Sequence, residues 1–111
     1  MWFKMSLILT EKSKKYIAKK KISNLSLEID YIEEPCTQIY DPKIEIIKDG
    51  NLDKFTNYKK VLNNGLTLNV SKSFIELYGD LNKFELDMGS LIKKKLIIKN
   101  VEPIIKNVCK V

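Results

Sequence analysis

The sequence predicts an α+β domain that is mainly β, a compact β-sandwich or curled mixed sheet with an N-terminal surface helix. Three stretches alternate apolar and polar residues as half-buried strands do, at residues 25–32, 66–70 and 83–88. Residues 11–20 instead place a narrow apolar stripe on a lysine-rich helix. Because strand signals outnumber helix signals, the helices are expected to lie on a sheet rather than to form a bundle.

The chain is expected to form a single domain over residues 1–111. This length is near the commonest domain size and is enough to bury one modest core. Residues 1–5 precede the regular pattern and are expected to be an N-terminal extension, and residues 101–111 are expected to be a C-terminal tail. The composition, 44% apolar and 31% charged, is that of globular proteins, without a membrane span or a signal-peptide core. A soluble, cytoplasmic protein with no membrane partner is therefore expected.

The first half of the chain is expected to run strand, helix, strand, loop. Residues 6–9 are a short extended run, and Thr10 is placed to cap the helix that follows. Pro35 lacks the amide hydrogen that a strand ladder needs, so the second strand is expected to end before it. Residues 35–42, framed by two prolines, are then expected to form a loop.

The second half reads as further strands joined by turns and one short helix. Residues 49–51 and 63–65 carry turn signals of the kind that hairpins use, and residues 52–62 are ambiguous between a helix and an irregular strand. Ser71 is expected to cap a short helix that ends near Gly79. The remaining strands are expected at residues 43–48, 66–70, 83–88 and, as the last strand, 91–99.

The charge pattern argues against nucleic-acid binding. The net charge is +6, but all twenty basic residues are lysines. Arginine supplies the bidentate contacts to phosphates and guanine edges that specific nucleic-acid binders favour, whereas lysine alone gives diffuse, salt-sensitive attraction. Nucleic acid is therefore not expected as a partner, and the lysine run at residues 93–95 is expected to be solvated.

The chain has no histidine, which excludes the usual triads, histidine zinc sites and the commonest general base near neutral pH. Glu33 and Glu34 are adjacent, so on a strand they face opposite sides and do not form a catalytic pair. We therefore expect a protein that is not an enzyme.

The two cysteines, Cys36 and Cys109, are the candidate site. They lie 73 positions apart, and a cytoplasmic setting argues against a structural disulfide, so they are expected to be free thiols, metal ligands or core residues. Cys36 is the stronger candidate because it lies in the predicted loop. Its alternatives are a space-filling residue and a reactive thiol. Two thiolates cannot fill the four ligand positions of a [2Fe–2S] cluster, but a homodimer that pairs Cys36 and Cys109 of both chains can.

The order of these elements resembles the HesB-like family of A-type iron–sulfur carriers, in a divergent branch with a single cysteine in the loop. The resemblance rests on Leu7–Ser13 running into the helix, on the strand Leu25–Ile32 leading to Cys36, and on Gly65–Lys72, followed by the strands that contain Leu86 and Leu96. It covers residues 6–100.

The resemblance implies a compact HesB-like fold and a role in iron–sulfur cluster assembly. Iron or an iron–sulfur cluster would be bound through Cys36, with Cys109 assisting across a homodimer, and would be exchanged with apo-protein or assembly partners. Glu34, Pro35 and Thr37 stand where cluster-binding members usually have glycines. The alternative is therefore a structural or interaction domain that keeps the fold without any cluster.

Overall fold

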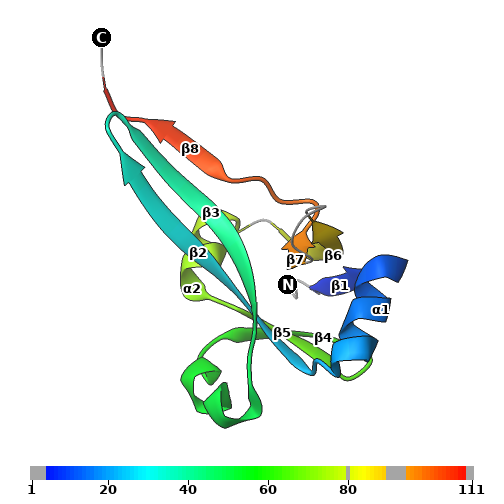
Figure 1. The fold of residues 1–111 in the computed structure, drawn as a ribbon. Coiled ribbons are helices and arrows are strands. Elements are labelled where there is room, and N and C mark those ends of the chain that lie inside the picture. The colour runs from blue at the N-terminus through cyan, green and yellow to red at the C-terminus, as the bar shows by residue number, and fades with distance from the viewer. Residues whose placement is uncertain (1–4, 80, 90–94, 110–111) are drawn as a thin grey trace.

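The computed structural model describes residues 5–79, 81–89 and 95–109, and Figure 1 shows its fold. In chain order, its elements are β1 (Ser6–Leu9), α1 (Glu11–Lys20), β2 (Asn24–Glu34), β3 (Thr37–Ile46), the 3-10 helix η1 (Asp49–Phe55), β4 (Lys59–Asn63), β5 (Leu66–Val70), α2 (Lys72–Leu77), β6 (Lys83–Gly89), β7 (Lys95–Ile98) and β8 (Ile104–Asn107). The prediction of a mainly β, α+β domain with a mixed sheet is confirmed.

The strands form two sheets. The smaller has the order β1-β6-β7, with β1 parallel to β6 and β7 antiparallel to it. The larger has the order β4-β5-β2-β3-β8, in which β2 is parallel to β5 and the other neighbouring strands are antiparallel. The side-chain amide of Asn63 joins the two sheets by donating a hydrogen bond to the Leu7 carbonyl at 2.6 Å.

The helix α1 has the predicted bounds and lies on the surface against the smaller sheet. Thr10 is its N-cap, and its side chain accepts a hydrogen bond from the amide of Ser13. Ser13 is fully buried, and its hydroxyl contacts the carbonyl oxygens of Thr10 at 2.8 Å and of Leu86 at 3.0 Å. The helix is thus attached to β6 by polar contacts as well as by its narrow apolar stripe.

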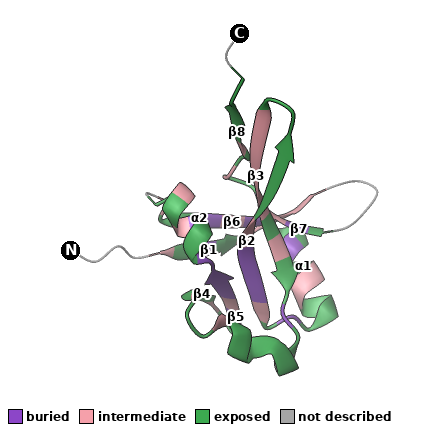
Figure 2. Cartoon of the chain, turned by 90° about the vertical axis from the view of Figure 1, so that its left-hand side faces the viewer, coloured by how far each residue is buried: buried purple, intermediate pink, exposed green. Residues whose placement is uncertain are grey.

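The core lies between the two sheets and α2. Figure 2 shows the buried segments gathered in the lower part of the molecule, on β2, β5 and β6. The fully buried side chains include Leu27 and Leu68 from the larger sheet, Phe84 from the smaller sheet and Phe74 from α2. No buried polar side chain in the described part of the chain lacks a hydrogen-bond partner.

The prediction of a loop at residues 35–42 is wrong. β2 continues to Glu34, Pro35 and Cys36 form a two-residue turn, and β3 begins at Thr37 and runs through Pro42. The third strand, β8, reaches along β3 only as far as Tyr40. Beyond that point β3 is an edge strand, where a proline without an amide hydrogen is tolerated.

The C-terminal part also differs from expectation. The strand predicted at residues 91–99 is described as β7, Lys95–Ile98, while residues 90–94 and most of the lysine run at residues 93–95 lie outside the described residues. It is not the last strand, because the segment expected to be a tail contains β8. Residues 1–4 of the expected N-terminal extension are likewise outside the described part.

Of the two turns predicted from the sequence, one is confirmed and the other is wrong. Asn64 and Gly65 join β4 to β5 with φ values of 43° and 86°, so the predicted hairpin is confirmed, and the positive φ is one that glycine adopts readily. Residues 49–51 do not form a hairpin turn but begin η1. The predicted short helix is α2, capped by Ser71.

The hydroxyl of Tyr58 donates a hydrogen bond to the Glu28 carboxylate at 2.6 Å, next to η1. This bond, with burial and the Glu28 charge, raises the pKa of Tyr58 from 10.0 to about 12. Because the pKa of Tyr58 is higher in the folded protein than in the unfolded chain, the bond between Tyr58 and Glu28 stabilises the fold fully below pH 10. This stabilisation is lost as the pH rises toward 12. Glu28→Gln should therefore move the Tyr58 titration toward 10.

An ultraviolet titration of tyrosinate, compared with Tyr58→Phe to isolate this phenol, measures the shift. Glu45→Gln is the matched control, because Glu45 pairs with Lys43 rather than with a tyrosine. A Tyr58 that ionises near pH 10 in the wild-type protein would contradict the prediction.

None of the helices among the described residues is long and apolar enough to cross a membrane.

Candidate functional site

The candidate site lies at the tip of a projecting arm. We define the arm as residues 28–45 of β2 and β3 together with β8, residues 104–107. In Figures 1 and 2 it extends away from the core as a three-stranded ribbon. The turn at its tip has Pro35 at the first central position and Cys36, with φ 66°, at the second. Proline followed by a residue with positive φ is the pattern of a type II turn.

Cys109 is brought to this turn by β8. The strand pairs antiparallel with β3 in the register Thr37 to Asn107, and the amide of Val108 donates a hydrogen bond to the Cys36 carbonyl at 2.9 Å. The two cysteines are joined by a disulfide with a Cα–Cα distance of 4.6 Å. The structure thus brings the two predicted site residues together.

The expectation that the thiols are free is corrected by this disulfide. The expectation rested on the reducing conditions of the cytoplasm, which say nothing of which residues are neighbours. The geometry follows from the register of β8 on β3, and that register depends on a strand that the sequence pattern did not reveal. Neither cysteine is a core residue, because both are exposed.

The surroundings of the disulfide are acidic and aromatic. Glu33, Glu34 and Pro35 are exposed beside it. Further down the arm, the rings of Tyr31 and Tyr40 pack with centroids 5.1 Å apart, and the Lys106 ammonium lies 5.2 Å from the Tyr40 ring. Partial desolvation, and then the negative charge of Glu33, raise the pKa of Tyr31.

Two cysteines per chain are fewer than the ligands that an iron–sulfur cluster needs. A [2Fe–2S] cluster takes four protein ligands, usually thiolates, and each chain has two cysteines. In residues 5–79, 81–89 and 95–109 no three cysteine, aspartate or glutamate side chains gather into a group that would hold a metal ion. In the disulfide the sulfurs are bonded to each other and are not thiolate ligands. One chain therefore does not fit a complete cluster site, whereas two reduced chains supply four thiolates.

Three exposed or half-buried isoleucines on the arm were not singled out from the sequence. Ile32, Ile39 and Ile105 are direct neighbours across β2, β3 and β8, so they form one row on one face of the ribbon. Ile105 is 66% exposed and Ile32 is 39% exposed. The alternation of residues along β2 by itself places Ile32 on the face opposite Leu25 and Leu27. The sequence therefore contains the signal for this one member of the row, without knowledge of the partner strands.

A comparison with solved structures shows which known fold this chain resembles. No protein-family model matches the sequence, and no curated protein matches it. Among solved structures, the chain is similar to a crystal structure of IscA with a [2Fe–2S] cluster, with a TM-score of 0.51 and 12% sequence identity. The match covers 85% of this chain and 83% of that one. The fold resembles that of this IscA structure, and at 12% identity the likeness extends to the fold alone.

Proposed function

We propose that the protein is a HesB-like carrier that binds iron or a small iron–sulfur cluster through the reduced thiols of Cys36 and Cys109. The observation that carries the proposal is the position of the only two cysteines, 73 residues apart in sequence and 4.6 Å apart between Cα atoms at one exposed tip. The IscA-like fold supports the same class of function.

The cargo would be held between two chains. Each dithiol provides two thiolates, and two arm tips facing each other complete the four that a [2Fe–2S] cluster needs. The exposure of both cysteines makes the tip accessible to a second copy, to an assembly partner and to an apo-protein acceptor. Binding and release of such cargo needs no catalytic base, so we propose a carrier rather than an enzyme.

Binding first requires reduction of the disulfide. Two electrons and two protons convert the Cys36–Cys109 bond to two thiols, and a thiol reductant supplies both while it is itself oxidised to a disulfide. The glutathione and thioredoxin systems of the cytoplasm are such reductants, which is consistent with the cytoplasmic location that we propose.

Anaerobic reconstitution with ferrous iron and sulfide, after reduction, tests the proposal. The wild-type chain should develop the visible absorption of a cluster, with about one [2Fe–2S] unit per two chains. Cys36→Ser and Cys109→Ser should each lose most of that absorption, and the double variant should lose all of it.

Reducing conditions also provide the control, because none of the four proteins then contains the disulfide and a difference in its stabilisation cannot explain a loss. The same absorption in the wild-type chain and the double variant, or no absorption in any chain, would refute cluster binding at this site.

The second candidate is a structural or interaction domain that keeps this fold without a cluster. The disulfide favours it, because a covalent link between the turn of the arm and β8 holds the ribbon together without any metal. The absence of cluster absorption in all four chains, together with an intact disulfide in protein isolated under thiol-trapping conditions, would select this reading.

A further inference from the structure

Charge is strongly segregated in this molecule. The arm carries six carboxylates and two lysines, a net charge of −4 (2 − 6), although the whole chain has a net charge of +6. Residues 11–21, which are α1 and its C-cap Lys21, carry six lysines and one glutamate, a net charge of +5 (6 − 1). Two surfaces of one molecule therefore have opposite charge.

The acidic surface of the arm has an apolar centre. Ile32, Ile39 and Ile105 form its row of isoleucines, and alternation along the strands puts Asp30, Glu34 and Asp41 on the same face as this row. Asp30, Ile32, Glu34 and Ile105 are exposed. We call these six residues the arm face. An apolar row next to carboxylates is complementary to an apolar hollow next to lysines.

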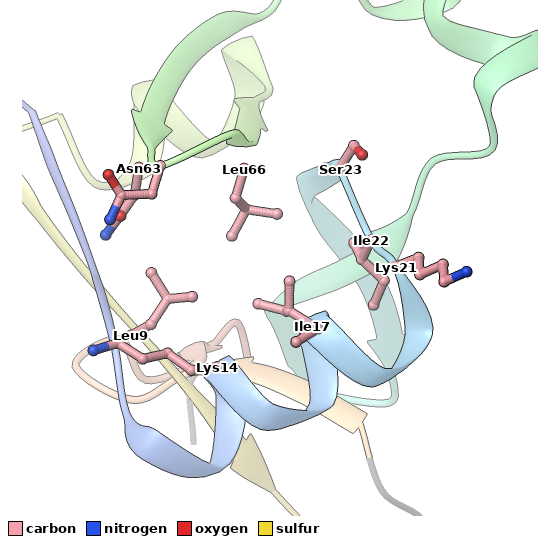
Figure 3. Close-up of a pocket in the computed structure, with 10 residues that line it drawn as sticks. Leu9, Lys14, Ile17, Lys21, Ile22, Ser23, Asn63 and Leu66 are labelled. Atoms are coloured by element: carbon pink, nitrogen blue, oxygen red, sulfur yellow. The ribbon is translucent and has the colours of Figure 1, made fainter.

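Such a hollow lies beside α1. A pocket of about 390 Å³ opens between α1 and the β4–β5 turn. In Figure 3 the side chains of Leu9, Ile17 and Leu66 point toward one another across it. Lys14 and Lys21 also line the pocket, and the figure shows them at its opposite ends. The pocket thus has an apolar floor and a basic rim, which is the complement of the arm face.

The two surfaces do not meet within one chain. In Figures 1 and 2 the arm projects away from α1. No ion pair joins the arm to α1 among the residues described, where Lys14 pairs with Glu11 of its own helix at 3.6 Å and Lys43 pairs with Glu45 within the arm at 3.0 Å. Both of these pairs are exposed and contribute little, so they leave the opposite charges available to another molecule.

We propose that a second copy of this chain docks its arm face on the α1 pocket. The isoleucine row would cover the apolar floor, and Asp30 and Glu34 would lie against Lys14 and Lys21. Because the two surfaces differ, a reciprocal arrangement closes a dimer and a one-way arrangement builds longer assemblies. The contact uses neither sulfur, so it can form in the oxidised, metal-free protein.

Sedimentation of the oxidised, metal-free protein tests this contact. Raising the salt from about 0.05 M to about 0.5 M shortens the screening length from about 14 Å to about 4 Å. The wild-type chain should self-associate at the lower salt, and its dissociation constant should rise about tenfold or more at the higher salt. A protein that stays monomeric at low salt up to about 1 mM chain, or that associates equally at both salts, overturns the proposal.

Charge reversal identifies the surfaces. The variant Asp30→Lys with Glu34→Lys and the variant Lys14→Glu with Lys21→Glu should each lose self-association, while a mixture of the two should form a heterologous complex. Combining all four substitutions in one chain should restore self-association. Lys72→Glu with Lys83→Glu is the charge-matched control, outside both surfaces, and should associate as the wild type does. Self-association of both reversed variants at wild-type strength overturns the proposal.

The contribution of the isoleucine row to self-association is tested separately. Ile105→Ser should weaken association at both salt concentrations, whereas Leu52→Ser, which changes an exposed leucine of η1, should not. Equal behaviour of these two variants would overturn the role of the isoleucine row.

Discussion

Reduction of the Cys36–Cys109 disulfide is expected to lower the free energy of unfolding by about 2–4 kcal/mol. The bond links residues that are 73 positions apart, so it removes much of the freedom of the unfolded chain. Denaturant titrations with and without a thiol reductant measure the change. Because β8 is a four-residue edge strand, its amides should also exchange with solvent faster in the reduced protein.

Cys36→Ser provides the control for this experiment. Its stability should equal that of the reduced wild-type chain and should not respond to the reductant. A wild-type stability that is unchanged by reduction, with the free thiols verified by alkylation, would show that the crosslink does not stabilise the fold.

Phe74→Ala is expected to cost about 3–5 kcal/mol, the second large effect. Phe74 is 1% exposed, and its ring stacks on Tyr78 at 4.7 Å and packs against Phe84 at 5.9 Å, measured between centroids. Its removal leaves a cavity where α2 meets β6 of the smaller sheet, and both the lost burial and the cavity destabilise the fold. Chemical denaturation, with the disulfide kept oxidised, measures the change.

Phe55→Ala is the matched control. Phe55 is half-buried and packs edge-on against Tyr58 at 4.9 Å in the η1 region, outside the core cluster. Its loss should cost clearly less than the loss of Phe74. Equal costs for the two substitutions would contradict the placement of Phe74 at the centre of the core.

The same pair of sulfurs has two proposed roles. As a disulfide it restrains the arm, and as a dithiol it would bind iron or a cluster. The reduction experiment and the reconstitution experiment separate these roles, because the first measures stability without metal and the second compares chains that all lack the disulfide. The isoleucine row does not include the sulfurs, since it lies on β2, β3 and β8.

Local sequence signals were sufficient where the neighbours along the chain decide the structure. Thr10 and Ser71 each cap a helix, because the side-chain oxygen of each accepts a hydrogen bond from the backbone amide three residues later. Asn64 and Gly65 adopt the positive φ that joins β4 to β5. In each case a contact within a few residues fixes the conformation, so the pattern of residue types is enough to predict it.

The same signals failed at Pro35 and Pro42. Read alone, each proline ends a strand, because it cannot donate a hydrogen bond. In the structure Pro35 is the first central residue of a tight turn, and Pro42 lies in β3 beyond the end of β8. Which side of β3 has a neighbour is a property of the whole sheet, and no local pattern contains it.

The sequence by itself determined the α+β class, the bounds of α1, and the fact that any thiol chemistry must use Cys36 and Cys109. The tertiary structure alone decided that these two residues meet, because their proximity depends on the register of β8 against β3. It also decided that the isoleucines of three strands form one row and that the acidic arm points away from the basic helix. Pairings between distant segments depend on packing that involves the whole chain, so they cannot be predicted from the spacing of residues in the sequence.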